Sequence, residues 1–446
     1  MQQDATRSDD RSGGAKIVLA TVGTLGDLHP FIAIGLALKA RGHRPLLAVA
    51  EDHLAKVRAS GLEAVAILPS FDTIRQRIGL PEGAAVKRVM SDQRYMLEEV
   101  VLPWLGSSTD ALSEVASDAD ALVASLFVFG SPTVAEKHDV PLVSVILQPM
   151  ALLSVYRPPH TPDFWMLKGN PKTSVGVGWN RLTFSLIRAM MRRRYMPVID
   201  EMRADHGLPP TTDPSLFEIG TQTALTLCCY SPVFGPLPKD APENVEVVGF
   251  PVFDSESGAA APPDQELADF LAAGPPPLVF TLGSFAVHAP GNFYAEAAEA
   301  ARRLGQRAVL LTGPGSTLRS DDRILVRAYA PHSTVFSHAS AIIHHGGIGT
   351  IGQALRAGKP QLVVPHMGDQ SDNAERIRRM GLGSVLKARR FTAGRAAPRI
   401  AALIDPARPY IAEAARIGAM VAAEQGARDA ALAIEKVIKD LPPAAN

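Results

Sequence analysis

Short, uninterrupted apolar runs recur along this chain and constrain its fold more than any other feature. One series lies at residues 16–20, 45–50, 64–68, 121–125, 141–146 and 224–229, and a second at 277–285, 307–313, 324–330, 341–347 and 361–370. A segment with helical apolar spacing follows the first run, at residues 31–43. Continuous apolar strands fed by helices are typical of parallel sheets covered on both faces. We therefore predict an α/β fold with two doubly wound, Rossmann-like domains that face each other across a cleft.

The length of the chain and one stretch of biased composition predict where these domains divide. A chain of 446 residues exceeds one ordinary hydrophobic core. Residues 250–276 are rich in Pro, Gly and Ala, which is typical of a linker. We expect a first domain at 15–249, a second at 277–420 and a C-terminal helix at 421–446. Residues 1–14 are polar and end in glycines, so we expect a disordered tail.

Composition narrows the classes of partner and location. Lys+Arg and Asp+Glu both number 45, and this zero formal charge argues against a nucleic-acid partner. Cys228 and Cys229 are the only cysteines and are adjacent, so we expect packing rather than a disulfide, in a reducing cytoplasm. The sequence contains no uninterrupted apolar run of about 18 residues, so no membrane-spanning helix is predicted.

A glycine-rich turn at residues 345–350 is the strongest local signal. An apolar run ends at His345, and a helix is expected from about Ile351. The residues between them are Gly346, Gly347, Ile348, Gly349 and Thr350. Glycines let the backbone approach an anion, and a helix N-terminus favours negative charge. Thr350 is suited to N-capping or to bonding a phosphate oxygen. The alternative is a tight turn that needs glycines for shape alone.

The residues around this turn carry a resemblance to a known family. Fixed spacings join Ala330, Pro331 and His332 to the turn, and continue through Gln353, the run 358–360, Pro365, Asp369, Gln370 and Asn373. The segment resembles the nucleotide-sugar signature of GT-B-fold glycosyltransferases. That family includes plant UDP-sugar transferases, sterol glucosyltransferases, and bacterial antibiotic and rhamnolipid transferases. The resemblance extends over essentially the whole chain after residue 14, with the rhamnosyltransferase and sterol-transferase branches looking closest.

The resemblance implies roles for these positions. The diphosphate of the donor would be held by Ser284, His345, Gly346, Gly347, Gly349 and Thr350. The base and ribose would be framed by Tyr329, Ala330, Pro331 and Gln353. Asp369 and Gln370 would bind the sugar hydroxyls. Many members carry Glu where this chain has Gln353, and an amide grips two ribose hydroxyls less strongly than a carboxylate does. A dTDP-sugar and a UDP-sugar both remain open as the donor.

A second loop, at residues 23–30, would carry the chemistry. Gly23, Thr24 and Gly26 form a G-x-x-G pattern that lacks the third glycine of a dinucleotide fingerprint, although Glu51 could imitate its ribose-binding acid. The resemblance implies a catalytic base three residues before Pro30, and that residue is Asp27. Asp27 could instead N-cap the following helix, which would place Pro30 in a first turn. His29 is a rival base.

Together these residues predict an inverting transfer of a hexose from a nucleoside-diphosphate sugar to the hydroxyl of a hydrophobic small molecule or lipid. The resemblance implies no cofactor and no essential metal. It also implies that the first domain binds the acceptor and that the terminal helix crosses back to it. An NDP-sugar 2-epimerase and a non-catalytic partner protein share the fold and stay open as alternatives. A dehydrogenase would bind NAD instead.

Residues 71–110 and 150–215 do not match the signature well, so we expect them to select the acceptor. An apolar helix surface is expected there, formed by Leu182, Phe184, Leu186, Ile187, Met190 and Met191. Such side chains can line an adaptable apolar pocket. The cluster at 192–194 could rest on anionic lipid headgroups, giving peripheral contact with the inner membrane surface. An ordinary helix pair with a solvated Arg end is the alternative.

Overall fold

The computed structural model describes residues 14–440 apart from 212, 214, 215, 217, 221, 222 and 256–263. The predicted N-terminal tail therefore lies outside the described residues except for residue 14, as do the middle of the predicted linker and the last six residues of the chain.

A seven-stranded, wholly parallel sheet forms the first half of the molecule. Its strand order is β3-β2-β1-β4-β5-β6-β7. The strands are β1 (Lys16–Ala20), β2 (Arg44–Ala50), β3 (Glu63–Leu68), β4 (Ala121–Ser125), β5 (Leu142–Ile146), β6 (Thr223–Cys228) and β7 (Val245–Val247). Their direction confirms the parallel pairing predicted from the apolar runs.

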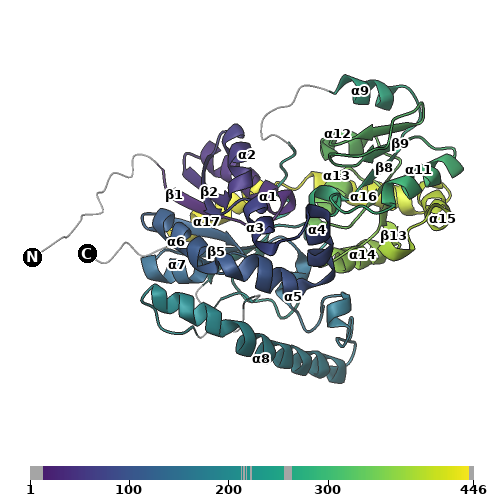
Figure 1. Cartoon of the computed structure of the whole chain (residues 1–446). Coiled ribbons are helices and arrows are strands. Elements are labelled where there is room, and N and C mark those ends of the chain that lie inside the picture. Colours follow the sequence, from purple (N-terminus) through teal and green to yellow (C-terminus); the bar gives the residue numbers. More distant parts are fainter. Residues whose placement is uncertain are drawn as a thin grey trace, which may run out of the picture.

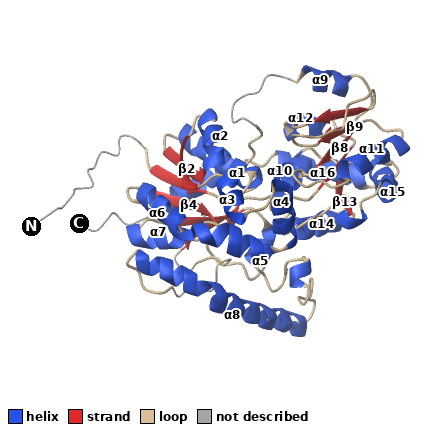
Figure 2. Ribbon diagram, viewed as in Figure 1, coloured by secondary structure: helices blue, strands red, loops and turns tan. Residues whose placement is uncertain are grey.

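A six-stranded parallel sheet forms the second half, in the order β10-β9-β8-β11-β12-β13. Its strands are β8 (Leu278–Thr281), β9 (Ala308–Leu311), β10 (Ile324–Arg327), β11 (Ala341–His344), β12 (Gln361–Val363) and β13 (Gly383–Val385). Figure 2 shows the two sheets side by side with helices around each. Strand order reverses between β1 and β4 and between β8 and β11. Such switch points open a crevice at the carboxyl ends of the strands.

Helices cover both sheets (Figure 1). Those of the first half are α1 (Leu25–Ala40), α2 (Leu54–Ala59), α3 (Phe71–Ile78), α4 (Glu82–Ser91), α5 (Gln93–Tyr95), α6 (Leu105–Ala116), α7 (Ser131–His138) and α8 (Ser174–Asp205). Those of the second half are α9 (Gln265–Ala272), α10 (Gly283–Ala286), α11 (Phe293–Arg303), α12 (His332–Ser337), α13 (Ile348–Arg356), α14 (Gln370–Arg379), α15 (Ala393–Ile404), α16 (Tyr410–Ala422) and α17 (Gly426–Lys439).

The alternation of side chains along β1 shows why its apolar run is unbroken. Ile17 and Leu19 lie in one apolar cluster, which includes residues of α1 and α17. Val18 and Ala20 lie in another, which includes residues of α6 and α7. All four are fully buried. Since successive side chains of a strand point to opposite faces, a sheet covered on both sides needs apolar residues at every position.

The terminal helix α17 crosses from the second half of the molecule to the first. Figure 1 shows it beside α1, away from the other helices of similar colour. The Glu435 carboxylate accepts hydrogen bonds from the Arg41 guanidinium at 2.5 and 2.9 Å and lies 3.0 Å from His43 Nε2. Ala430 and Ile434 are fully buried in the same cluster as α1. An ion pair at a helix end and an apolar stripe thus hold α17 to the first sheet.

Several local features differ from the sequence predictions. Strands β7 and β13 were not predicted, because three residues are too few to show an apolar period. The stretch expected to be linker contains α9, whose first turn is capped by the Asp264 side chain accepting from the Leu267 amide at 3.0 Å. Pro30 lies inside α1 rather than in its first turn, because the helix begins at Leu25.

Two further sequence expectations concern the cysteines and the membrane. Both cysteines are buried and free, in agreement with the packing role predicted for them. Among the helices that the structure describes, none combines the length and apolar character needed to cross a membrane.

The packing of α17 gives a stability prediction. Ile434→Ala is expected to lower the free energy of unfolding by about 2–5 kcal/mol, because it leaves a cavity in a fully buried cluster. Leu432→Ala is the matched control on the same helix; Leu432 is exposed, and its truncation should change stability by less than about 0.5 kcal/mol. Urea denaturation of both variants provides the measurement. Equal effects would contradict the packing of α17 on the first domain.

Candidate functional site

The glycine-rich turn lies at the carboxyl end of β11 and leads directly into α13. Gly346 has φ +93°, and a Cβ there would lie 2.7 Å from Val363 Cγ1, so both conformation and space require glycine. The Gly346 amide donates to His344 Nδ1 at 3.1 Å, and His344 Nε2 lies 3.0 Å from Gln361 Oε1. This chain of contacts fixes the turn before any ligand binds.

His345 stands between two glycines that come from different loops. A Cβ on Gly283 would lie 2.4 Å from His345 Cε1, and a Cβ on Gly347 would lie 2.3 Å from Nε2. The buried Nδ1 of His345 has no hydrogen-bond partner among the described residues. Burial and neighbouring histidines hold the pKa of His345 well below its usual range. The ring is therefore neutral, and it can donate one N–H to an anion.

The start of α13 differs from the sequence prediction. The helix begins at Ile348 with Gly347 at its N-cap, three residues earlier than expected. Thr350 is therefore not an N-cap; it is a buried residue of the first helical turn. Glycine at the N-cap leaves the first amides of the helix without a side-chain partner of their own. These amides and the positive end of the helix dipole face the turn, which suits an anionic ligand.

Asp369 and Gln370 lie at the start of α14 and are tied to the same turn. Asn373 Nδ2 donates to the Gly346 carbonyl at 3.0 Å and to Asp369 Oδ2 at 2.7 Å. Gln370 Oε1 accepts from the amides of His366 and Met367, at 2.8 and 3.1 Å. The Gln370 oxygen is thus already engaged, which leaves its NH2 group for a ligand. Asn373 was part of the sequence pattern but had no predicted role; it connects the glycine-rich turn to Asp369.

The other residues predicted to bind the donor are distributed around the turn. Ser284 lies half-buried in α10, directly after Gly283, and Gln353 lies half-buried in α13. Ala330 is 2% exposed and packs in an apolar cluster, so only its backbone can face a ligand. Tyr329 and Pro331 flank it, at the start of α12.

Asp27 lies in the first turn of α1, where its carboxylate accepts the Thr24 amide at 2.8 Å. It is therefore the acidic partner of a capping box whose N-cap is Thr24, and the N-cap alternative for Asp27 itself is wrong. Desolvation raises the pKa of Asp27 to about 6, against the lowering effect of its bonds to Thr24. A carboxylate with this pKa is a better proton acceptor than an exposed aspartate near neutral pH.

The two loops meet across the domains. A Cβ on Gly349 would lie only 3.9 Å from Gly26 Cα, so the backbones of the glycine-rich turn and the Asp27 loop face each other. Desolvation, reinforced by the charge of Asp27, raises the pKa of Asp369 to about 7. The N-termini of α1 and α13 therefore open onto one region that contains both carboxylates. Sequence reasoning placed these groups in different domains, and the structure brings them together.

The part of the linker that the structure describes lies beside this region. His29 packs edge-on against Phe253 with ring centroids 5.4 Å apart, and burial lowers its pKa to about 4. The Asp254 carboxylate accepts from the backbone amides of His332 and Ser333 at 3.2 and 2.5 Å. Asp254 thus anchors the linker to the start of α12. It carried no signal in the sequence, because its partners are backbone groups of a distant loop.

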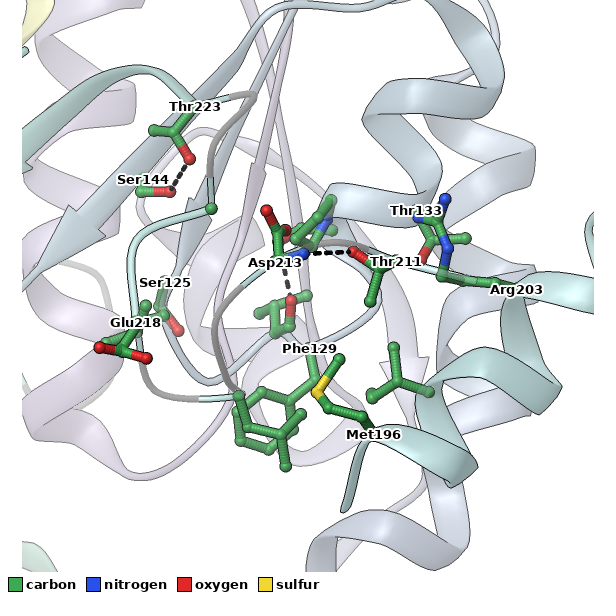
Figure 3. Close-up of a pocket in the computed structure, with 17 residues that line it drawn as sticks. Ser125, Phe129, Thr133, Ser144, Met196, Arg203, Thr211, Asp213, Glu218 and Thr223 are labelled. Atoms are coloured by element: carbon green, nitrogen blue, oxygen red, sulfur yellow. Dashed lines mark hydrogen bonds between the residues drawn. The ribbon is translucent and has the colours of Figure 1, made fainter. Parts of the chain in front are cut away.

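A pocket lies beside the end of β4, between the first sheet and α8. Figure 3 shows its lining, with Ser125, Ser144 and Thr223 from three neighbouring strands and Met196 and Arg203 from α8. The Ser125 hydroxyl is buried and has no partner among the described residues. A second pocket shares Ser125 and Leu126 and continues along the end of β5. Ala20 pairs with Ala124, so this opening adjoins the end of β1 from which the Asp27 loop departs.

Comparisons with known proteins show which family the chain belongs to. The model of the C-terminal domain of erythromycin biosynthesis protein CIII-like proteins matches residues 316–436. The chain is 32% identical over 429 residues to O-mycaminosyltylonolide 6-deoxyallosyltransferase of Streptomyces fradiae, covering 94% of this chain and 97% of that protein. The chain belongs to the GT-B glycosyltransferases. The predicted family, fold class and enzyme class of this glycosyltransferase are thereby confirmed.

Further relatives of this glycosyltransferase include a plant enzyme and two glycosyltransferases of solved structure. It is 28% identical to a sterol 3-beta-glucosyltransferase of Arabidopsis thaliana, covering 82% of this chain and 57% of that protein. The calicheamicin glycosyltransferase CalG4 shares its fold with a TM-score of 0.68 at 21% identity, covering 96% of this chain and 100% of that one. The glycosyltransferase VinC, solved in complex with dTDP, has a TM-score of 0.67 at 19% identity, covering 95% of this chain and 99% of that one. The enzyme is thus of the antibiotic and sterol type.

The raised pKa of Asp369 in this glycosyltransferase predicts a pH-dependent stability. Below about pH 4 the carboxyl is protonated in both the folded and the unfolded chain, so its burial costs nothing there. As pH rises toward 7 the unfolded chain ionises first, and stability falls. Asp369→Asn should therefore stabilise the enzyme at pH 8, by roughly 2–4 kcal/mol, and have little effect at pH 4.

Glu375→Gln, on the same helix, is the control of opposite sign. Hydrogen bonds from Arg378 and, less strongly, from Arg379 lower the pKa of Glu375 to about 2. Removal of this carboxylate should therefore destabilise the enzyme at pH 8. Denaturation midpoints at the two pH values measure both variants. Destabilisation by Asp369→Asn at pH 8 would contradict the buried state of this carboxyl.

Proposed function

We propose that this glycosyltransferase moves a hexose, with inversion, from a dTDP- or UDP-sugar to a hydroxyl of a hydrophobic small molecule or lipid. The observation that carries the proposal is the approach of Gly26 and Gly349. It brings a carboxylate of raised pKa and the glycine-rich turn together where the two domains meet. A glycosyl transfer needs both groups within reach of one sugar.

On the donor side, the diphosphate would occupy the turn at 346–350. The free Nδ1 of His345 and the first amides of α13 supply hydrogen-bond donors, and the Ser284 hydroxyl adds another from the opposite loop. Asp369 and the NH2 group of Gln370 would then face the sugar hydroxyls. Asn373, which bonds both the turn and Asp369, would hold the Asp369 carboxylate beside the turn. The tyrosine at 329 and the backbone at 330–331 would frame the base.

The choice of nucleotide rests on Gln353 and on the relatives. An amide at this position suits a deoxyribose, which offers one fewer hydroxyl than ribose. The complex of VinC with dTDP shows that a protein with this fold holds that nucleotide. The name of the Streptomyces fradiae relative specifies transfer of a 6-deoxyallosyl group. These observations support dTDP as the first nucleotide to test, with UDP as the second.

The chemistry assigned to Asp27 is the removal of the acceptor proton. The acceptor oxygen forms a bond to C1 of the sugar while the bond from C1 to the diphosphate oxygen breaks, and the electron pair leaves with the diphosphate. The sugar passes through an oxocarbenium-like state, so the proton can move late, when the hydroxyl has become acidic. Attack from the face opposite the diphosphate inverts C1. The His345 imidazole and the turn amides stabilise the charge on the leaving group, so the proposal needs no metal or cofactor.

The position of His29 favours Asp27 as the base. The His29 ring packs against Phe253 of the linker, and its pKa of about 4 leaves it a weak proton acceptor. The pockets that meet at Ser125 would receive the acceptor, because they open beside the end of β1 that leads to Asp27.

Nucleotide binding tests the donor half of the proposal. Purified protein in EDTA buffer is titrated with dTDP, UDP, GDP and NAD while the unfolding midpoint is followed. A ligand at 100 times its Kd stabilises a protein by about 2.7 kcal/mol. We expect dTDP or UDP to stabilise the protein and NAD to have no effect. Absence of stabilisation by every nucleoside diphosphate would overturn the donor assignment, whereas stabilisation by NAD alone would favour a dehydrogenase.

Asp27→Asn tests the catalytic half. The amide cannot take up the acceptor proton, so the turnover number should fall by about 10²–10⁴-fold while the affinity for the nucleotide is retained. His29→Gln is the control and should retain most of the turnover. Both measurements require a donor and an acceptor panel of apolar alcohols and lipids. A normal turnover number in Asp27→Asn would remove Asp27 from this role, and a sugar product formed without any acceptor would indicate a 2-epimerase.

A further inference from the structure

Helix α8 carries a continuous apolar face that the protein does not cover. Val175 is 80% exposed, Leu182 56%, Leu186 64% and Met190 61%, with Trp179 between them at 47%. Their spacing of three or four residues places them on one side of the helix. The sequence grouped three of these side chains with Phe184 as one pocket-lining surface. That expectation is wrong for Leu182, Leu186 and Met190, because they point outward while Phe184 is buried.

A different side of α8 packs against the rest of the first domain. The C-terminal half of α8 contributes Tyr195, Met196, Ile199 and Met202 to an apolar cluster with Leu97 and Phe129. Figure 1 shows α8 along the outer edge of the first domain. The helix is thus anchored on its inner side, and the outer apolar stripe contributes nothing to that anchorage. Large exposed apolar areas of this kind mark interaction surfaces.

The segment that forms this face carries charged side chains of one sign only. Residues 164–199 contain seven basic side chains and no acidic one, in a chain of zero formal charge. Arg188 and Arg194 form ion pairs with Glu218 and Glu98, which belong to other segments. Arg181, Arg193 and Lys172 are exposed on α8 or just before it. An apolar stripe with basic flanks is the pattern of a helix that lies in the interface of an anionic bilayer.

The loop before α8 extends the face with a further aromatic. Trp165 is 78% exposed and Met166 44%, and the Trp179 indole N–H donates to the Met166 carbonyl at 2.9 Å. Trp is favoured at the boundary between lipid headgroups and acyl chains. This contact joins the loop and the helix into one surface, which we define as the α8 face: Trp165, Met166, Val175, Trp179, Leu182, Leu186 and Met190.

We propose that the α8 face docks this protein on the surface of an anionic membrane, with α8 parallel to the bilayer plane. The apolar stripe enters the headgroup boundary, and the basic residues beside it contact lipid phosphates. A second copy of the chain fits this surface less well. A two-fold interface would place the same basic flanks against each other, and like charges in contact oppose association.

The position of the face gives this docking a role in the proposed transfer, and this part rests on the proposed function. His160, in the same loop as Trp165, donates its backbone amide to Asp372 of α14 at 2.9 Å. The loop end of the α8 face therefore lies where the two domains meet. A lipid acceptor taken from the membrane would enter the protein beside the donor site.

Vesicle co-sedimentation tests the docking without any sugar donor. The full-length protein is mixed with vesicles of phosphatidylglycerol and phosphatidylcholine, or of phosphatidylcholine alone. We expect the unmodified protein to bind the anionic vesicles. Arg181→Gln and Arg193→Gln should each weaken this binding by about fivefold. Leu182→Glu/Leu186→Glu should weaken it by at least about tenfold. Ile411→Glu/Met420→Glu, at two exposed apolar positions of α16, is the matched control and should bind as the unmodified protein does.

The outcomes distinguish membrane docking from self-association and from misfolding. Circular dichroism melting of each variant confirms that it is folded. Equal binding of the Leu182→Glu/Leu186→Glu variant and its control would overturn the proposal. A second result would also overturn it: no binding to vesicles, together with a dimer in light scattering that the Leu182→Glu/Leu186→Glu substitutions convert to a monomer. That result would assign the face to a second copy of the chain. Loss of nucleotide binding in the donor experiment would leave the vesicle result unaffected, so the two proposals fail independently.

Discussion

The close approach of two helix N-termini is the constraint on which the site depends. α1 and α13 belong to different sheets, and the backbones of Gly26 and Gly349 nearly touch where the helices begin. A side chain at position 349 would extend toward Gly26, into the space between the two loops. Both helices direct the positive end of their dipoles toward this point, and α13 also directs its uncapped first amides there. The fold therefore concentrates positive potential there without a basic side chain.

The same region lowers the stability of the folded protein. Asp27 and Asp369 are both held in surroundings that raise their pKa values, to about 6 and about 7, and each ionised carboxylate there is destabilising. The rest of the structure compensates around them. Asn373 and Thr24 donate to these carboxylates, His344 fixes the turn, and Asp254 anchors the linker to α12. Buried charge of this kind is common where a protein needs reactive groups rather than stability.

The relative placement of the domains depends on contacts far from the glycine loops. α17 returns to the first sheet through Ile434 and the Arg41–Glu435 ion pair, and the linker packs Phe253 against His29. These two connections, one from the end of the chain and one from its middle, join the two halves. The α8 face lies outside this framework, so its exposed apolar side chains are free to serve an external surface.

The sequence by itself determined the fold class, the two parallel sheets and the position of the glycine-rich turn. Those features depend on local patterns: unbroken apolar strands, glycines directly before a helix, and a family signature with fixed spacings. Tertiary structure alone decided that Asp27 is the acidic partner of a capping box, that α13 starts at Gly347 and Ile348, and that Leu182 and Phe184 face opposite ways. It also decided which distant groups meet, as with Asp27 and Asp369 or Asp254 and Ser333. Such pairings arise from the packing of whole domains, and neighbouring residues in the chain carry no record of them.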